Sequence, residues 1–333
     1  MAQSPPRRRI VGIAALGLAG ALAAGAIAIP TFVEPRVLKV PLTAGSVSEA
    51  TGFATMVDVA TLVRDRTLAT HRVPVRATQM ISVIEPSDDT IMTIQTAHRM
   101  SRADIDSPTD STITAAVTQI TVDRRTGYPV PGRDAKIFSK HDAPATTHTI
   151  DGLSFKFPFG TKTHTYRFFD HTAHNSYSME FQGVDTVEGI EVYRFRSETP
   201  QVRIGEPLSL PAEYFGGSKG DTREVSRYYH ATREFRVEPL TGMIVDARQT
   251  ARQYVAAAPD SETRVTLIDV DAGWSEATRT AQFDDARRAR AMIQWGLHRS
   301  PWLGWLLAAT MLGIGVAALR NRSGSAPEGP VRR

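Results

Sequence analysis

Two uninterrupted hydrophobic runs stand near opposite ends of the chain. The first covers residues 10–30 and the second residues 301–319, and neither contains a charged side chain. An α-helix rises about 1.5 Å per residue, so each run is long enough to cross the roughly 30 Å hydrocarbon core of a bilayer. Pro301 suits a first helical turn, and Trp302 and Trp305 are typical of a membrane interface. The pattern predicts two transmembrane helices.

Arginines flank both runs on the side of the chain termini, at Arg7 to Arg9 and at Arg320 and Arg322. The positive-inside rule therefore places residues 1–9 and the tail 320–333 in the cytoplasm. This predicts a two-pass protein of the cytoplasmic (inner) membrane whose main domain, residues 31–274, is periplasmic or otherwise extracytoplasmic.

The first run has a second interpretation as a cleavable signal peptide, because its small residues offer Ala-x-Ala sites. The run is longer than the usual signal core of roughly 7–15 residues, which favours a retained helix, and the question of cleavage stays open. Small residues at four-residue spacing could also let the two helices pack together, or could be ordinary membrane residues. They are Gly17, Ala21, Gly25, Gly304 and Ala308.

Between the runs the hydrophobic pattern has a period of two. Leu153 to Phe159 alternates apolar and polar residues with a thick aromatic face, and Lys162 to Phe169 alternates again. This is the signal of half-buried β-strands. Pro158 cannot donate a hydrogen bond to a neighbouring strand, so we expect an edge strand or a strand end there.

Hairpins recur along this region. Val184 to Phe195 turns at Glu188-Gly189, where glycine supplies a positive φ. Two further hairpins, at residues 120–130 and 235–245, share an acidic residue followed by two residues and Thr-Gly, which we attribute to convergent turn chemistry rather than to duplication. Other predicted strands cover residues 77–84, 90–98, 111–122, 243–255 and 262–270.

About a dozen strands without βαβ spacing predict a mainly β fold, an antiparallel β-sandwich or a partly open barrel flanked by N- and C-terminal transmembrane helices. Residues 199–221 are rich in Pro and Gly and predict a long loop. Residues 275–300 change to helical spacing and predict an amphipathic juxtamembrane helix, resting on the membrane surface or against the domain.

Composition and charge exclude several classes of function. The chain has no cysteine, which excludes disulfides, thiolate metal sites and a cysteine nucleophile. The net charge of +4 comes from the arginines near the termini, and no clustered basic face predicts a nucleic-acid partner.

The motif search predicts that the protein is not an enzyme, with no catalytic residue and no cofactor. The chain lacks a Gly-x-Ser-x-Gly elbow, a phosphate-binding loop, a His-Glu-x-x-His pair and a dinucleotide-binding glycine motif. His164, His171 and His174 lie close in sequence, but a zinc site needs three or four convergent ligands. We interpret them as ordinary histidines and predict no metal site.

The segment from Leu153 to Asp170 is distinctive enough to indicate a protein family. This segment resembles the signature of an actinobacterial family known as porin PorA, through Phe157, Pro158, Phe159, Gly160 and Thr161. The stretches 122–127, 187–195 and 227–245 and the two terminal anchors are also similar to that family. The cysteine pair that many relatives carry after the position of Gly127 is absent. The resemblance implies a membrane protein of the mycolate-containing envelope, whose possible partners are the membrane, an envelope glycolipid and a lipid-export transporter.

The richest feature of the β region is its aromatic cluster. It has two interpretations, a hydrophobic core or the lining of an apolar groove for an acyl chain, and both stay open. Its members are Phe155, Phe157, Phe159, Tyr166, Phe168 and Phe169.

We therefore expect a non-enzymatic envelope-biogenesis factor that binds or helps to traffic envelope (glyco)lipids, or docks on a lipid-export complex. A porin or channel and a structural scaffold are the alternatives. A transmembrane β-barrel needs strands of about 9–11 residues with an apolar outer face. The many charges and the prolines Pro158, Pro200, Pro207 and Pro211 weigh against such strands here.

Overall fold

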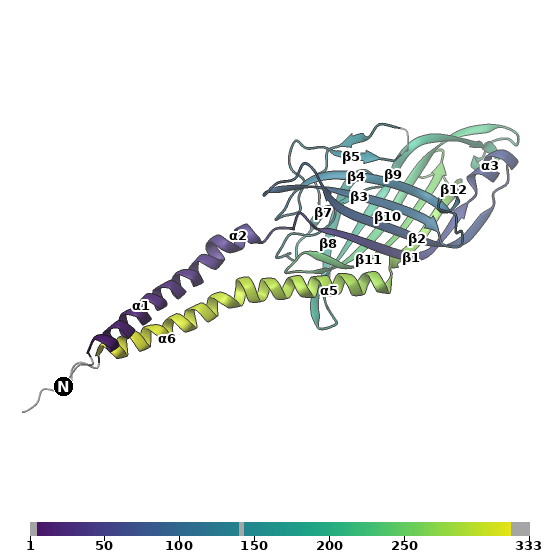
Figure 1. Cartoon of the computed structure of the whole chain (residues 1–333). Helices are drawn as coiled ribbons and strands as arrows, with labels where there is room; N and C mark the ends of the chain where they lie inside the picture. The colour runs from purple at the N-terminus through teal and green to yellow at the C-terminus, as the bar shows by residue number, and fades with distance from the viewer. Residues whose placement is uncertain (1–4, 140–142, 321–333) are drawn as a thin grey trace, which may run out of the picture. The chain divides into compact units, whose positions relative to one another are not determined.

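The computed structural model describes residues 5–139 and 143–320, which fall into two compact units. One unit combines residues 1–39 with residues 289–333, and the other covers residues 40–288. The first is helical and the second is built on a large sheet (Figure 1).

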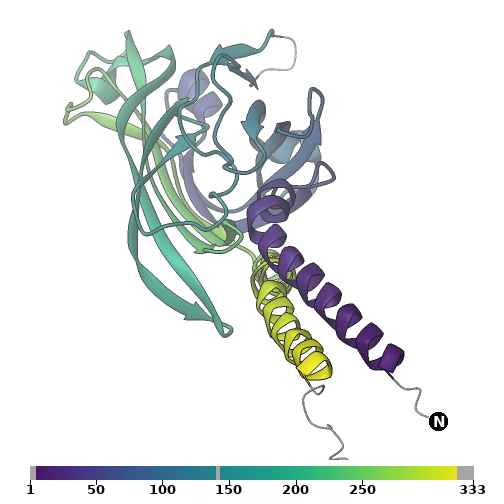
Figure 2. The same cartoon turned by 90° about the vertical axis from the view of Figure 1, so that its left-hand side faces the viewer.

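Within the described residues, twelve strands form one antiparallel sheet that curls into a half-barrel (Figure 2). This confirms the predicted mainly β fold and its partly open barrel. The strands are β1 (Gly45–Val57), β2 (Thr70–Ile84), β3 (Ile91–Arg102), β4 (Thr112–Asp123), β5 (Ala135–Phe138), β6 (Thr146–His148), β7 (Tyr166–Asp170), β8 (Asn175–Val187), β9 (Ile190–Pro211), β10 (Thr222–Glu238), β11 (Met243–Ala256) and β12 (Arg264–Trp274).

The order of the strands is β6-β5-β4-β3-β2-β1-β12-β11-β10-β9-β8-β7. Each half of the sheet is therefore a meander in which strands that follow one another in sequence pair with one another. The halves meet where β1 pairs with β12, in a register that includes Ala54 opposite Val270. At that joint Gly52 lies so close to the neighbouring backbone that a Cβ would sit 2.0 Å from the carbonyl oxygen of Asp271. Glycine permits this close approach.

Strand β7 connects the hydrophobic clusters of the two halves. Phe169 packs with residues of β3, β4 and β5, including Ile94 and Ile137. Phe168 packs with Phe195 of β9 and residues of β8 and β10. Both faces of β7 are thus covered. Successive side chains of a strand point to opposite faces, which explains why two consecutive residues of β7 are aromatic.

The prediction of a strand at residues 153–159 is wrong. This segment is irregular apart from one parallel bridge between Leu153 and Phe168. The N–H of Leu153 belongs to this bridge and bonds to the carbonyl of Arg167 at 2.8 Å. The N–H of Phe157 bonds instead to the carbonyl of Gly242 at 2.8 Å. Burial does not alternate along the segment, because Ser154 and Lys156 are buried whereas Phe155 and Phe159 are partly exposed. The alternating sequence pattern therefore does not mark a strand here.

The prediction of a loop at residues 199–221 is also wrong, because β9 continues to Pro211 and is followed by the short helix η2 (Ala212–Phe215). The pairing of β9 with β10 shifts register near Pro200 and near Gly205, whose φ is +60°. β-Bulges accommodate residues that a regular ladder excludes. Proline and glycine therefore mark irregularities of a long strand rather than its end.

The outer face of the sheet is crossed by ion pairs between neighbouring strands. Arg248 of β11 contacts Asp271 of β12 at 2.7 Å, and Arg252 contacts Asp269 at 2.5 Å. The other outer pairs include Arg76–Glu49, Arg196–Glu234 and Arg236–Asp246. Most of these side chains are about half exposed, so each pair adds little stability. Together they give this face the character of a water-exposed surface.

Short helices border the sheet, and a longer one packs on it. The short ones are α3 (Val59–Asp65) and α4 (Pro108–Ser111). The predicted amphipathic helix is α5 (Glu276–Ile293), whose Phe283 and Ala286 pack against Val192 of β9 and Val245 of β11. This part of the helix lies against the domain rather than on a membrane.

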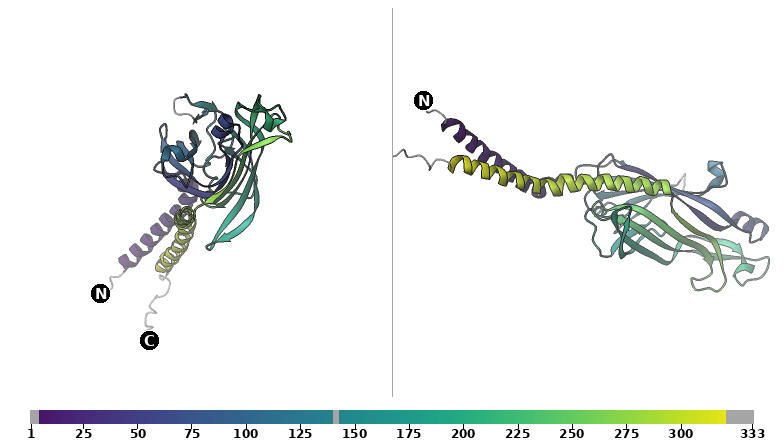
Figure 3. Two further views of the ribbon diagram at one scale, coloured as in Figure 1. Left: turned by 90° about the vertical axis from the view of Figure 1, so that its right-hand side faces the viewer. Right: turned by 90° about the horizontal axis from the view of Figure 1, so that it is seen from below.

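The helical unit contains α1 (Pro5–Ala28), η1 (Ile29–Val33) and α2 (Glu34–Val37) from one end of the chain, and η3 (Gln294–Arg299) and α6 (Ser300–Arg320) from the other. Two continuous helical stretches, Arg9–Val37 and Glu276–Arg320, are long and apolar enough to cross a membrane. Figure 3 shows α1 and α6 running side by side.

Small residues let α1 and α6 approach each other. Ala15, Ala19 and Ala26 of α1 are buried, as are Ala308 and Gly315 of α6. A Cβ on Gly315 would lie 2.8 Å from the side chain of Leu16. The predicted packing thus uses Gly304 and Ala308, but Gly17, Ala21 and Gly25 lie on the exposed face of α1.

Candidate functional site

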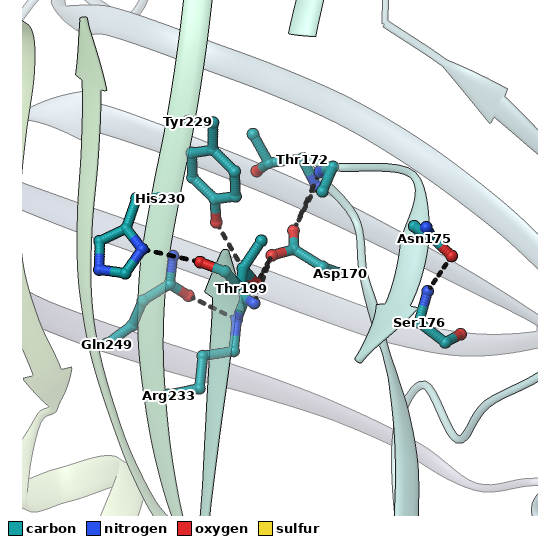
Figure 4. A network of polar contacts seen from close by, with 10 residues as sticks. Asp170, Thr172, Asn175, Ser176, Thr199, Tyr229, His230, Arg233 and Gln249 are labelled. Atoms are coloured by element: carbon teal, nitrogen blue, oxygen red, sulfur yellow. Dashed lines mark hydrogen bonds and ion pairs between the residues drawn. The ribbon is translucent and has the colours of Figure 1, made fainter. Parts of the chain in front are cut away.

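An ion pair inside the sheet is the centre of the most developed polar network in the described residues. Asp170, at the end of β7, is 1% exposed, and its Oδ2 lies 2.6 Å from a guanidinium nitrogen of Arg233 on β10. The same oxygen accepts a hydrogen bond of 2.7 Å from the hydroxyl of Thr199 on β9 (Figure 4). One carboxylate therefore joins three strands.

The turn after β7 holds the second oxygen of Asp170. Its Oδ1 accepts hydrogen bonds from the backbone N–H groups of Thr172 at 2.8 Å and Ala173 at 3.1 Å. Such Asx turns are typical where an aspartate ends a strand. The backbone of the β7–β8 turn and the side chain of Arg233 thus fix the carboxylate from two sides.

The other nitrogens of the Arg233 guanidinium also donate hydrogen bonds. It donates to the hydroxyl oxygen of Tyr229 at 3.0 Å and to the amide oxygen of Gln249 at 3.1 Å. His230 Nδ1 donates to the backbone carbonyl of Thr199 at 2.8 Å. A buried guanidinium requires this degree of satisfaction, because an unpaired one would cost several kcal/mol.

The network shifts the pKa values of its members. Burial alone would raise the pKa of Asp170, but the Arg233 guanidinium and the hydrogen bonds around the carboxylate hold it well below its usual range. Burial raises the pKa of Tyr229 to about 12. At neutral pH the site therefore holds a charged carboxylate, a charged guanidinium and a neutral phenol.

Histidines connect the β7–β8 turn to the other half of the sheet. The ring of His171 lies 4.6 Å from that of His98 on β3, and its Nδ1 is 3.3 Å from the hydroxyl of Thr118 on β4. His174, at the end of the turn, lies 4.5 Å from His148 of β6. The Asp170 carboxylate thus fixes the turn to β9 and β10. Histidine contacts connect the turn to β3, β4 and β6.

The structure separates His164 from His171 and His174, which share the β7–β8 turn. The ring of His164 lies tilted against that of Tyr166, with centroids 4.2 Å apart, and has none of the contacts of His171 and His174. In the described part of the chain, no group of three His, Cys, Asp or Glu side chains is arranged to hold a metal ion.

Burial and the neighbouring Arg233 lower the pKa of His98 to about 4, and burial with His98 and Arg233 lowers that of His171 well below its ordinary value. Below pH 6.5 the unfolded chain binds these protons and the folded chain does not, so stability present above pH 6.5 is lost as the pH falls towards 4. We expect His98 alone to contribute a loss of about 2 kcal/mol between pH 7 and pH 5.

Urea unfolding of the full chain in detergent at both pH values tests this prediction. The variant His98→Gln is expected to lose less stability on acidification than the parent protein. His71→Gln, which changes an exposed histidine of β2, serves as the control. An equal acid effect in all three proteins would contradict the assignment to His98.

The family motif lies between two turns of the same construction. In one, Asp123 accepts from the backbone N–H and hydroxyl of Thr126; in the other, Glu238 accepts from the same groups of Thr241. Each turn ends in a glycine of positive φ, Gly127 at +75° and Gly242 at +72°. The shared sequence form noted above therefore reflects a shared turn geometry.

Residues 156–161 dock on these turns. A Cβ on Gly127 would lie 3.4 Å from the carbonyl oxygen of Lys156, and one on Gly242 would lie 2.1 Å from that of Phe157. Thr161 donates its backbone N–H to the carbonyl of Pro239 at 2.7 Å. The motif is the piece of backbone that fits against the second turn.

Lys156 is buried inside this segment. Its ammonium nitrogen lies 3.8 Å from the centre of the Phe159 ring, and no hydrogen-bond partner is found for it among the described residues. Burial lowers the pKa of Lys156 to about 7. The sequence shows only an alternating polar position there, so this buried amine was not predictable.

The structure packs the six predicted aromatic residues into two clusters. Phe157, Tyr166 and Phe168 lie with Phe195 and Val237 in one cluster, and Phe157 stacks on Phe195 at 4.7 Å. Phe169 is buried in the other cluster, against which Phe155 and Phe159 pack while partly exposed. This is the arrangement of a hydrophobic core, and the groove interpretation stays a prediction.

The sequence did not predict the central polar residues of the site. Asp170, Thr199 and Arg233 are separated by 29 and 34 positions and belong to three strands. The available signal was local: an aspartate directly after Phe168-Phe169 and before a turn. It marks a capped strand end, but it does not indicate which arginine pairs with it.

Comparison with known proteins places the chain in a well-defined context. The sequence model of the family described as Porin PorA matches residues 11–317. A protein named Porin PorA from Corynebacterium amycolatum is 26% identical over 389 aligned positions, covering 96% of this chain and 100% of the relative. A second Porin PorA, from Corynebacterium resistens, is 24% identical over 309 positions, covering 72% of this chain and 74% of the relative.

These relatives overturn the expected function. We expected a factor that binds or traffics envelope lipids, whereas the relatives carry the name of a porin. That expectation is wrong, and the alternative of a channel is the supported one. The charges and prolines of the β region weigh only against a pore whose strands face lipid. The two apolar helical stretches offer another way across the membrane.

Proposed function

The chain belongs to the Porin PorA family, and from this membership we propose that it is a channel-forming protein of the cell envelope that lets small solutes cross a membrane. The observation that carries the proposal is the family match over residues 11–317, which covers nearly all of both helical stretches and the whole sheet. The proposed protein is non-enzymatic and needs no cofactor.

In this proposal α1 and α6 cross the cytoplasmic membrane, with both termini in the cytoplasm and the β-rich unit on the other side. The arginines at residues 7–9 and at Arg320 and Arg322 support this orientation. The ion pairs on the outer face of the sheet support a water-exposed position for the β-rich unit, because charged side chains facing lipid would be costly.

Two helices cannot enclose a water-filled path, so the proposal requires several copies of the chain. Gly17, Ala21 and Gly25 support such an assembly, because they leave a face of α1 without side-chain bulk, and no described atom lies within 4 Å of a Cβ placed on Gly17 or Gly25. Small residues at four-residue spacing are typical of close contacts between membrane helices.

Conductance of the purified full chain in planar bilayers tests the proposal. We expect stepwise currents from the parent protein. Gly17→Leu is expected to reduce the conductance more than tenfold and to shift the protein towards single copies, because the larger side chain separates the helices. Gly313→Leu, the same change at an open position of α6, is the matched control and is expected to conduct normally.

Two results would count against this function. Folded parent protein that gives no current above the empty bilayer would contradict the channel itself. Equal currents from Gly17→Leu and Gly313→Leu would contradict the assembly through this face of α1.

A further inference from the structure

Each of the two apolar helical stretches contains one π-helical turn. On the N-terminal stretch it is η1 (Ile29–Val33), on the C-terminal stretch it is η3 (Gln294–Arg299), and the two turns contact each other. π-Helical turns are rare in proteins, and those that occur often lie at functional sites. Their occurrence at the same level of both helices defines a band across the helical unit.

An aromatic residue and an arginine lie four positions apart at each turn. The Arg36 guanidinium is 5.9 Å from the centre of the Phe32 ring and donates to the Phe32 carbonyl at 2.8 Å. The Arg299 guanidinium is 4.7 Å from the centre of the Trp295 ring. A ring orients each of these two cations, and a carbonyl also orients Arg36, but neither kind of group carries a negative charge that would neutralise them.

The aromatic side chains of the band are exposed. Phe32 is 62% exposed, Trp295 58% and Trp302 77%. Large exposed rings beside arginines are unusual on a water-facing helix and typical of the boundary between lipid and water. A guanidinium there reaches phosphate oxygens while its apolar stem stays in the lipid.

The position of the band along the helices agrees with this. The uncharged runs 10–30 and 301–319 extend from it towards the chain termini. Each has the length of about 30 Å that a hydrocarbon core requires, so a band at one end of both runs coincides with one membrane surface.

We propose that the two π-helical turns mark the membrane boundary at the end where the chain enters the β-rich unit, and that Arg36 and Arg299 bind phosphate groups of anionic lipids there. The inference extends beyond channel formation and does not depend on it. Each guanidinium supplies charge for a phosphate, and the exposed ring beside it supplies apolar surface for the first carbons of an acyl chain.

The first experiment measures depth. The chain contains no cysteine, so single cysteine substitutions label unique positions. Spin labels are placed by Gly296→Cys in η3, Gly17→Cys in the middle of α1 and Val47→Cys on the outer face of the sheet, in the full chain reconstituted in phosphatidylglycerol vesicles. We expect headgroup depth at position 296, hydrocarbon depth at 17 and water at 47. A label at 296 in bulk water or at the bilayer centre would overturn the boundary.

The second experiment measures lipid preference. The full chain in detergent is mixed with phosphatidylglycerol or phosphatidylcholine, and the bound lipid is counted by native mass spectrometry. We expect phosphatidylglycerol to be preferred, and Arg36→Gln and Arg299→Gln to reduce its affinity about fivefold each. Arg299→Lys tests the guanidinium against charge alone and is expected to retain part of the preference.

The control removes the same number of positive charges from the sheet. The double variant Arg248→Gln/Arg252→Gln also removes two exposed arginines and is expected to bind phosphatidylglycerol as the parent does. If the double variant Arg36→Gln/Arg299→Gln binds as much phosphatidylglycerol as the control does, the proposed lipid site is wrong. Because neither readout involves current, loss of this site is distinguishable from loss of the channel.

Discussion

Replacing Asp170 with alanine is expected to lower the free energy of unfolding by about 3–5 kcal/mol, because it leaves the Arg233 guanidinium buried without its counter-charge. The same change frees the hydroxyl of Thr199 and two backbone N–H groups of the β7–β8 turn. Unmade hydrogen bonds of buried groups add to the loss. Urea unfolding of the full chain in detergent, followed by circular dichroism, measures the effect.

The control is an ion pair of the same chemistry on the outer face. Asp271→Ala removes the partner of Arg248, whose side chain is 63% exposed, and is expected to cost less than about 1 kcal/mol. The double variant Asp170→Asn/Arg233→Met removes both charges and is expected to recover part of the stability lost in Asp170→Ala. Equal losses for Asp170→Ala and Asp271→Ala would show that the buried pair has no special role.

Replacing Gly242 with alanine is expected to lower the free energy of unfolding by about 3 kcal/mol or more. The new Cβ would lie 2.1 Å from the carbonyl oxygen of Phe157 and 2.5 Å from that of Pro158, so the family motif would have to leave the turn. The φ of +72° adds backbone strain for alanine, whereas glycine adopts this conformation without strain. The same unfolding measurement applies.

Gly127→Ala is the matched control for this prediction. Gly127 ends the twin turn with nearly the same φ, +75°, but its Cβ would meet the nearest atom at an ordinary 3.4 Å. We expect a loss of about 1 kcal/mol from backbone strain alone. Similar losses in both variants would mean that the contact with Phe157 does not hold the motif in place.

Local patterns were sufficient for the general architecture. Alternation and turn residues predicted a mainly β unit with about a dozen strands, and the two uncharged runs predicted the terminal helices. The turn at Glu188-Gly189 was located to the residue, since both have positive φ, +49° and +77°. These features depend on neighbours in sequence, which is why the sequence reveals them.

The errors arose where distant contacts override local preference. Residues 153–159 alternate like a strand, but their backbone partners are Gly242 and Arg167. Apart from the single bridge between Leu153 and β7, no strand of the described residues pairs with them. Pro200 and Gly205 predicted a loop, but a long strand passes through them with shifts of register. The partner of Asp170 lies 63 positions away, and local sequence carries no information about that distance.

The joint between β1 and β12 has a consequence for biosynthesis. The first meander is made early, yet its strand β1 cannot find its second neighbour until residues 264–274 have left the ribosome. Until then the growing chain presents an unpaired strand edge, which is a template for aggregation. We therefore expect slow translation after residue 250 to prolong the exposure of this edge.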